Sequence, residues 1–349
     1  MRPPRWLVAF ALANLAALAL TLVAAWQPWT AAAGEDRVSE SLVRRWLPFA
    51  LALMAAGAAY VGALLPPVER SRFLLRHLAL YLVVPLLLLL LRASPLASNA
   101  LFGSLYVLAG FAFALHALHA LFRVVPSLRD RGGALALAAI ALVLYLVILP
   151  YHRAVQPTAS DEPHYLLITQ SLIYDGELDL RNDYEGDRYR VFYPDRLPDM
   201  HGIEVGRAVY PIRDVGLPAL SALPFALGGR SGVLALVCAL AAACVAQLYL
   251  LLRDLRFAPR VALLAVAAVA LTHPFLTYTT QVYPDLIAAL VFVSAARVLR
   301  HGDALRPRDL ALASALTALL PWLTTRAWLI AVGLALAVAY WALAPLWRR

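Results

Sequence analysis

Long apolar stretches recur along this chain of 349 residues, and they constrain its fold more than any other feature. Hydrophobic residues make up 62% of the sequence, which is more than a soluble core of this length can bury. The stretches lack the strict polar and apolar alternation of an outer-membrane barrel, and helices are the other way to satisfy backbone polar groups in lipid. The sequence therefore predicts an all-α polytopic membrane protein.

About ten of these stretches qualify as transmembrane helices, five before the long polar segment and five after it. They cover residues 6–26, 47–65, 78–91, 101–121, 134–150, 233–252, 261–276, 285–299, 310–323 and 327–346. A further apolar stretch, residues 215–227, is shorter than the ~20 residues that a crossing needs. It also contains Pro218 and Pro224, which disrupt a helix. We therefore expect an interfacial or re-entrant helix there, broken at these prolines.

Arginine clusters predict the topology. The net charge of +9 comes from arginine alone, since the chain has no lysine, and it is spread over short turns. Such turns favour the cytoplasm, and their scatter argues against a nucleic-acid surface. The prediction is a multi-pass membrane protein, with both termini cytoplasmic and the polar segment outside. Residues 1–33 are also compatible with a signal peptide, and its cleavage would leave the downstream topology unchanged.

The polar segment holds twelve of the 21 acidic residues, between Asp161 and Asp214. Carboxylates beside a bilayer are costly unless they serve a function. Asp161 and Glu162 are adjacent, so one of them should have a raised pKa or be held by a cation or an arginine, and such a carboxylate suits a general base. An acidic pair before Pro163 is equally typical of a helix start. The spacing alone leaves both interpretations open.

The segment after this pair predicts a helix on the membrane surface. Apolar residues from Tyr165 to Ile173 follow helical spacing, and Gly176 ends the pattern. The acids beyond it alternate with arginine and tyrosine and do not match an EF-hand loop, so we expect most of them to form a solvated loop with ion pairs.

Two later turns on the predicted outer face carry charged residues. Asp285 follows Tyr283 and Pro284 at the start of a span, where an acid also complements the helix dipole. Arg326 lies in the next outer turn, against the positive-inside preference. We expect Arg326 to pair with an acid or to bind an anion such as phosphate.

Together these motifs resemble the GT-C superfamily of membrane glycosyltransferases, especially bacterial relatives of protein O-mannosyltransferases (glycosyltransferase family 39) and lipid A aminoarabinose transferases. The resemblance covers roughly residues 134–346. It rests on Ser-Asp-Glu-Pro-His-Tyr at 160–165, Asp-Leu-Arg-Asn at 179–182, Pro-Ile-Arg-Asp-Val-Gly-Leu-Pro at 211–218, Ala-Leu-Gly-Gly-Arg at 226–230 and Leu-Pro-Trp-Leu-Thr-Thr-Arg at 320–326.

The resemblance implies a transferase module at residues 131–349, with an outer-face loop at 151–230, behind a four-helix membrane region at 1–130. It implies transfer of a hexosyl or pentosyl group from a polyprenyl-phosphate sugar to an acceptor of unknown kind. The implied catalytic acids are Asp161, Glu162 and Asp285. The implied substrate-binding residues are His164, Tyr165, Arg213, Tyr283 and Arg326.

No metal ligand is assigned, and the expectation is a transferase without a cofactor, although some superfamily members use a divalent metal. The expected partners are the lipid-linked donor, the acceptor and membrane lipid. The alternative is a non-enzymatic carrier or transporter of lipid-linked sugars. Transporters place their charges at the bilayer midplane on broken helices, often in repeated halves, and this chain has its acids in a surface loop and no evident repeat.

Overall fold

The computed structural model describes Glu69, Arg72, Thr158 and residues 99–155, 160–197 and 201–347. These residues divide into two compact units. The first is the described part of Met1–Pro157 together with Ala258–Ala267. The second is the described part of Thr158–Phe257 together with Ala268–Arg349. This division falls after Pro157, whereas the one predicted from the sequence falls after residue 130.

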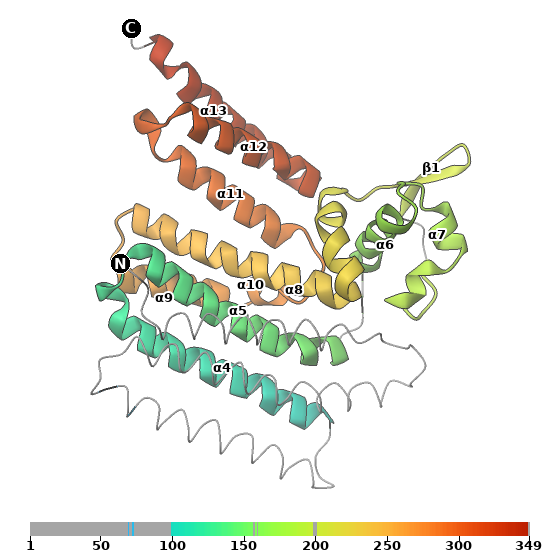
Figure 1. The fold of residues 1–349 in the computed structure, drawn as a ribbon, viewed down its shortest axis with the longest axis horizontal. Helices are drawn as coiled ribbons and strands as arrows, with labels where there is room; N and C mark the ends of the chain where they lie inside the picture. Colours follow the sequence, from blue (N-terminus) through green and yellow to red (C-terminus); the bar gives the residue numbers. More distant parts are fainter. Residues whose placement is uncertain are drawn as a thin grey trace. The chain divides into compact units, whose positions relative to one another are not determined.

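A helical hairpin forms most of the described part of the first unit. Helix α4, Asn99–Val124, leads through the 3-10 helix η1, Val125–Ser127, into α5, Asp130–Val155. The two long helices pack side by side (Figure 1). A Cβ on Gly110 would lie 3.1 Å from the Val147 side chain, so this glycine permits their close approach.

Four helices of the second unit pack in sequence, each against the next (Figure 1). They are α8, Gly216–Asp254; α11, Asp285–Leu299; α12, Pro307–Leu323; and α13, Trp328–Trp347. Shorter elements connect them: α9, Pro259–Ala270, which starts in the first unit; α10, Phe275–Tyr278; η3, Gly302–Ala304; and η4, Thr325–Ala327.

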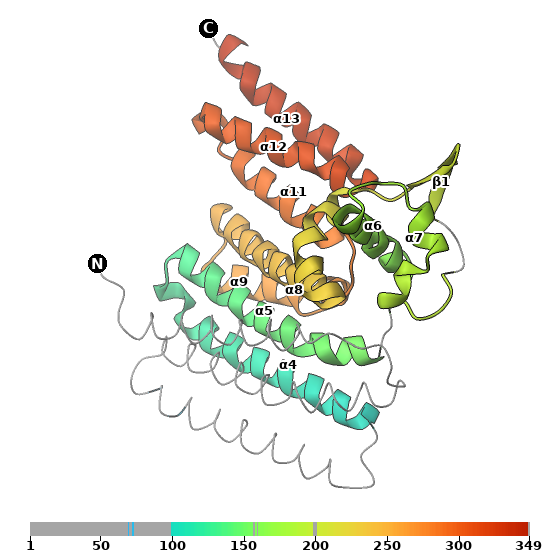
Figure 2. The ribbon, with the colours of Figure 1, turned by 45° about the vertical axis from the view of Figure 1, so that its right-hand side comes forward.

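The polar segment folds onto one end of α8 in the second unit (Figure 2). It contains α6, Glu162–Tyr174; α7, Arg181–Glu185; η2, Arg188–Val191; and an antiparallel hairpin of β1, Gly202–Val205, and β2, Ala208–Pro211. Ion pairs hold this segment together, as predicted. They join Arg188 to Asp175 and Asp183, Arg181 to Glu185 and Glu204, and Arg190 to Asp187.

The described part of the chain contains three helices that are long and apolar enough to cross a membrane, at Asp130–Leu149, Gly216–Asp254 and Thr325–Ala344. This supports the predicted helical membrane class, whereas the count of ten spans stays a prediction. The spans predicted at residues 6–26, 47–65 and 78–91 lie outside the described residues.

Two predicted helices differ from the structure. The span predicted at 261–276 ends at Ala270, because backbone before Pro274 disfavours the helical conformation. The predicted surface helix is α6, but its residues from Glu162 to Ser171 are buried on every side instead of along one stripe. It therefore packs inside the unit, against α8. The sequence argument missed this burial because a helix on the membrane surface keeps one polar face in solvent, whereas polar residues of α6 such as Ser171 are buried as well.

The predicted short helix at 215–227 is present as the first part of α8, but the break after it lies at Gly228 and Gly229, not at the prolines. Gly229 has φ 56° and ψ −146°, a conformation that only glycine adopts without strain. Beyond the break, Gly232 lies against the carbonyl of Pro224, where a Cβ would come within 2.0 Å of the oxygen. Gly229 and Gly232 therefore allow a sharp kink, after which a second helical segment starts at Arg230.

We expect Gly229→Ala to destabilise the protein by about 1–3 kcal/mol, because an added Cβ strains this backbone even with open space around it. Gly228→Ala is the matched control, since Gly228 has φ −150° and equally open surroundings. Thermal unfolding of both variants in detergent measures the difference. Equal melting temperatures would show that the turn does not depend on the Gly229 conformation.

Candidate active site

Asp161 stands at the start of α6 without capping it. Its carbonyl oxygen accepts hydrogen bonds from the amides of His164 and Tyr165, at 3.1 and 3.2 Å. Its side chain makes no capping hydrogen bond to the helix. The helix-start interpretation therefore accounts for the backbone of Asp161 and for a favourable charge beside the helix dipole, but not for any hydrogen bond of its carboxylate.

The Asp161 carboxylate instead faces two cationic or ionisable groups from the loop beyond α7. Arg213 Nη2 donates a hydrogen bond to Asp161 Oδ1 at 2.5 Å, and His201 Nδ1 lies 3.6 Å from the same oxygen. The Asp161 side chain is 17% exposed, so a small polar group can approach it from solvent. The three residues together form a partly open acid and base cluster.

Glu162 points away from this cluster and is buried. Arg230 Nη2 donates to both of its carboxylate oxygens, at 3.2 and 3.3 Å, and the Val282 amide donates to Oε1 at 3.0 Å. The side chains of Glu162 and Arg230 are only 4% and 10% exposed. The pair joins α6 to the second part of α8 and to the segment before α11. An arginine thus holds each of the adjacent acids, as their repulsion predicted.

Loss of either partner of the Glu162–Arg230 pair should cost about 3–5 kcal/mol, because it leaves an uncompensated buried charge. We expect Glu162→Gln and Arg230→Ala each to lower the free energy of unfolding by this order. The control is Glu185→Gln, whose side chain is 60% exposed and pairs with Arg181 at 3.5 Å; such a pair contributes up to about 1 kcal/mol. Chemical unfolding in detergent compares the variants, and similar losses in all three would contradict the buried-pair assignment.

A buried network around His164 supports the Asp161 cluster. The rings of His164 and His201 stack at 3.8 Å between centroids. His164 Nδ1 lies 2.8 Å from the Tyr184 hydroxyl, which also accepts the His201 amide at 3.2 Å. Burial, together with the charges of His201 and Arg213 and against the opposing effect of Asp161, lowers the pKa of His164 to about 4. Neutral His164 can therefore accept a hydrogen bond from the Tyr184 hydroxyl, and His201 lies beside Asp161.

The lowered pKa of His164 makes stability depend on pH. The unfolded chain binds the proton below pH 6.5, whereas the folded protein does so only near pH 4. The stabilisation is therefore complete above pH 6.5 and is lost as the pH falls towards 4. We expect His164→Gln to flatten the fall in melting temperature over this window, and His273→Gln, at an exposed position, to leave it unchanged. A wild-type slope in the His164 variant would contradict the assignment.

Tyr165 connects the Asp161 cluster to the segment that carries Asp285, the third predicted catalytic acid. Its ring meets Tyr283 edge-on, with centroids 6.3 Å apart. Burial raises the pKa of Tyr165 to about 12, and the charges of Arg213, Asp214, Asp161 and Asp285 also act on it. Asp285 is the first residue of α11, and its side chain has no hydrogen bond or ion pair with the described residues, so its carboxylate both complements the helix dipole and remains available.

Arg326 lies in a turn that is tied to the site, but its own side chain is exposed and forms no ion pair with a described residue. The Thr325 amide donates to Asp214 Oδ2 at 2.9 Å. A Cβ on Gly216 would come within 2.3 Å of the Trp322 carbonyl oxygen, so the two segments touch. The predicted salt bridge from Arg326 to an acid is therefore absent from the described structure, and its guanidinium is available to an anion.

Four residues of this region were missed as site residues by the sequence analysis: Tyr184, His201, Asp214 and Arg230. Arg230 carried a usable signal, since it is a cation at the outer end of a predicted span, against the same preference that singled out Arg326. His201 and Tyr184 carried none, because their proximity to His164 depends on how the loop folds.

Neither a metal site nor a similar known protein identifies the chemistry of this site. The described residues include no group of three or more His, Cys, Asp or Glu side chains placed to hold a metal ion. No protein-family model matches the chain, and no curated protein and no solved structure matches it either. The resemblance to GT-C transferases therefore stays a prediction.

Proposed function

We propose that the protein is a membrane glycosyltransferase that moves a hexosyl or pentosyl group from a polyprenyl-phosphate donor to an acceptor on the extracytoplasmic face. It would be integral to the bacterial inner membrane, with about ten spans and both termini in the cytoplasm. Three apolar helices of the described chain support membrane insertion. The polar segment packed on the end of α8 supports a site at the bilayer surface.

The observation that carries the proposal is the different environment of two adjacent carboxylates. Glu162 is buried and fully engaged by Arg230 and Val282. Asp161 is partly exposed and lies between a guanidinium and an imidazole. A positioned carboxylate can serve as a general base, and a guanidinium beside it can stabilise a departing lipid phosphate. The proposal therefore makes Asp161 the base and Glu162 a positioning residue.

The Asp161–Arg213 pair suggests how donor binding prepares the base. An Asp161 oxygen that accepts from Arg213 is occupied and is a poor proton acceptor. The donor phosphate competes for the same guanidinium, which binds phosphate well. Once Arg213 turns to the phosphate, Asp161 can take the proton of an acceptor hydroxyl or amine. The acceptor then bonds to the anomeric carbon while the bond from that carbon to the phosphate oxygen breaks.

Other residues have secondary roles in this scheme. Arg326, exposed on a turn held by Asp214 and Thr325, would neutralise the departing polyprenyl phosphate together with Arg213. Tyr283, half-buried against the buried Tyr165, would present its ring to the sugar, and Asp285 would orient the acceptor. The short segment at the start of α8 would admit the lipid tail from the side.

Asp161→Asn tests the proposal. We expect turnover of a polyprenyl-phosphate sugar to fall ~10²- to 10⁴-fold, the usual contribution of a positioned base. Donor binding should remain, because Arg213 is then released from its acid. The assay is consumption of radiolabelled donor by purified protein in nanodiscs with a panel of acceptors, beside a filter-binding measurement of donor affinity.

Asp195→Asn is the matched control, since Asp195 is an exposed acid of the same segment with no hydrogen bond among the described residues. It should keep wild-type turnover. Full turnover by Asp161→Asn would remove Asp161 as the base. Tight donor binding by the wild-type protein without consumption under any acceptor would point to the carrier alternative instead.

A further inference from the structure

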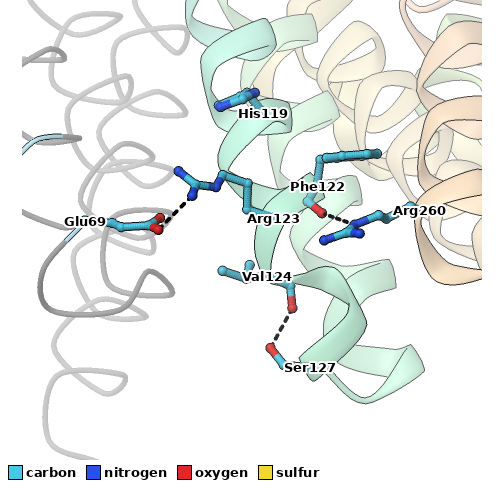
Figure 3. A pocket seen from close by; sticks show the side chains of 7 residues that line it. All are labelled: Glu69, His119, Phe122, Arg123, Val124, Ser127 and Arg260. Carbon is cyan, nitrogen blue, oxygen red and sulfur yellow. Dashed lines mark hydrogen bonds and ion pairs between the residues drawn. The ribbon is translucent and has the colours of Figure 1, made fainter.

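A basic pocket lies in the first unit, where α4 ends. Its volume is about 650 Å³. It is lined by Glu69, His119, Phe122, Arg123, Val124, Ser127 and Arg260 (Figure 3). Its described lining includes two arginines, a histidine and one carboxylate, so the charges of these residues favour an anion over a cation.

Arg260, at the second position of α9, is exposed, and two contacts with Phe122 orient its side chain. Its Nε donates to the Phe122 carbonyl oxygen at 3.2 Å, and its guanidinium carbon lies 5.0 Å from the centroid of the Phe122 ring. These two contacts orient the guanidinium plane. Its terminal nitrogens have no hydrogen-bond partner among the described residues. A guanidinium edge held in this way matches the spacing of two phosphate oxygens.

Arg123 approaches the pocket from the last turn of α4 (Figure 3). Its Nη2 donates to Glu69 Oε1 at 2.7 Å, and the two side chains are 51% and 35% exposed. Such an exposed pair contributes little to stability, so an anion can replace the Glu69 carboxylate at low cost. His119 lies one turn earlier on α4 and adds a third nitrogen-bearing group to the same wall.

We propose that the basic pocket, which Arg123 and Arg260 both line, binds the phosphate group of an anionic phospholipid headgroup. In the topology predicted from the arginine clusters, both residues lie at the cytoplasmic surface of the bilayer, where anionic headgroups gather. The amino-terminal end of α9 adds a positive dipole beside Arg260. A soluble phosphate shares this chemistry, and the lipid tails and the location distinguish the two sources.

A purely structural role for Arg260 is the competing explanation, because its Nε also satisfies a carbonyl in the last turn of α4. This role needs neither Arg123 nor the terminal nitrogens of Arg260. It predicts lower stability without any phosphate dependence. Ligand-dependent melting therefore separates the two explanations.

The test is thermal unfolding of the full-length protein in detergent, titrated with dihexanoyl-phosphatidylglycerol, dihexanoyl-phosphatidylcholine or inorganic phosphate. Ligands that bind only the folded state raise the melting temperature in proportion to their saturation. We expect saturable stabilisation by both lipids. The half-saturating concentration of the phosphatidylglycerol should be about tenfold below that of the phosphatidylcholine, since only phosphatidylglycerol carries a net charge. Stabilisation by inorganic phosphate to the same extent would assign the pocket to the soluble anion.

Arg123→Gln and Arg260→Gln should each raise the half-saturating concentration of the phosphatidylglycerol about tenfold. Arg260→Lys, which keeps the charge but loses the planar fork, should weaken binding too. The matched control is Arg131→Gln, in the same basic region but outside the pocket lining. Equal stabilisation by both lipids, or unchanged binding in the folded fraction of both glutamine variants, would overturn the proposal. The readout is binding, so it is independent of transferase activity.

Discussion

The buried ion pair of Glu162 and Arg230 is the interaction on which the candidate site depends. It joins the first residue of α6 to the point where α8 resumes after its break, and the Val282 amide adds the segment before α11. A carboxylate removed from water needs such compensation on both oxygens, otherwise its desolvation would outweigh the attraction. The register between the polar segment and the helices is set at this place. Asp161, one residue earlier, is thereby held at the surface of the unit.

The break in α8 makes this pair geometrically accessible. Only glycine adopts the backbone of Gly229 without strain, and the absence of a side chain at Gly232 lets the chain pass close to the Pro224 carbonyl. Arg230 follows at once and reaches α6. A second connection runs from Asp214 to the Thr325 amide, across the contact between Gly216 and Trp322. These two attachments position one acid cluster and one exposed arginine at the same end of the second unit.

Sequence reasoning was accurate where a single physical requirement acted locally. Helix α11 begins at Asp285 and ends at Leu299 as predicted, because a proline and an acid mark its start and apolar residues continue to an arginine turn. The sequence also predicted that one of Asp161 and Glu162 has a raised pKa or is held by a cation or an arginine, since two adjacent carboxylates repel, and the structure shows an arginine at each. The same reasoning missed the burial of α6 around its whole circumference. It also placed the break in α8 at prolines that the helix tolerates, instead of at two glycines.

The sequence by itself determined the helical class, the position of most described helices and the segment that carries the acids. Hydropathy, charge and turn residues act over short stretches of chain, so they can be recognised without a partner. Only the tertiary structure decided which arginine meets which acid, because Arg213 and Arg230 lie 52 and 68 residues from Asp161 and Glu162. It also decided that one carboxylate is buried and engaged while its neighbour stays partly open. Burial is a property of the packed unit, and adjacent residues of one helix start can face different surroundings.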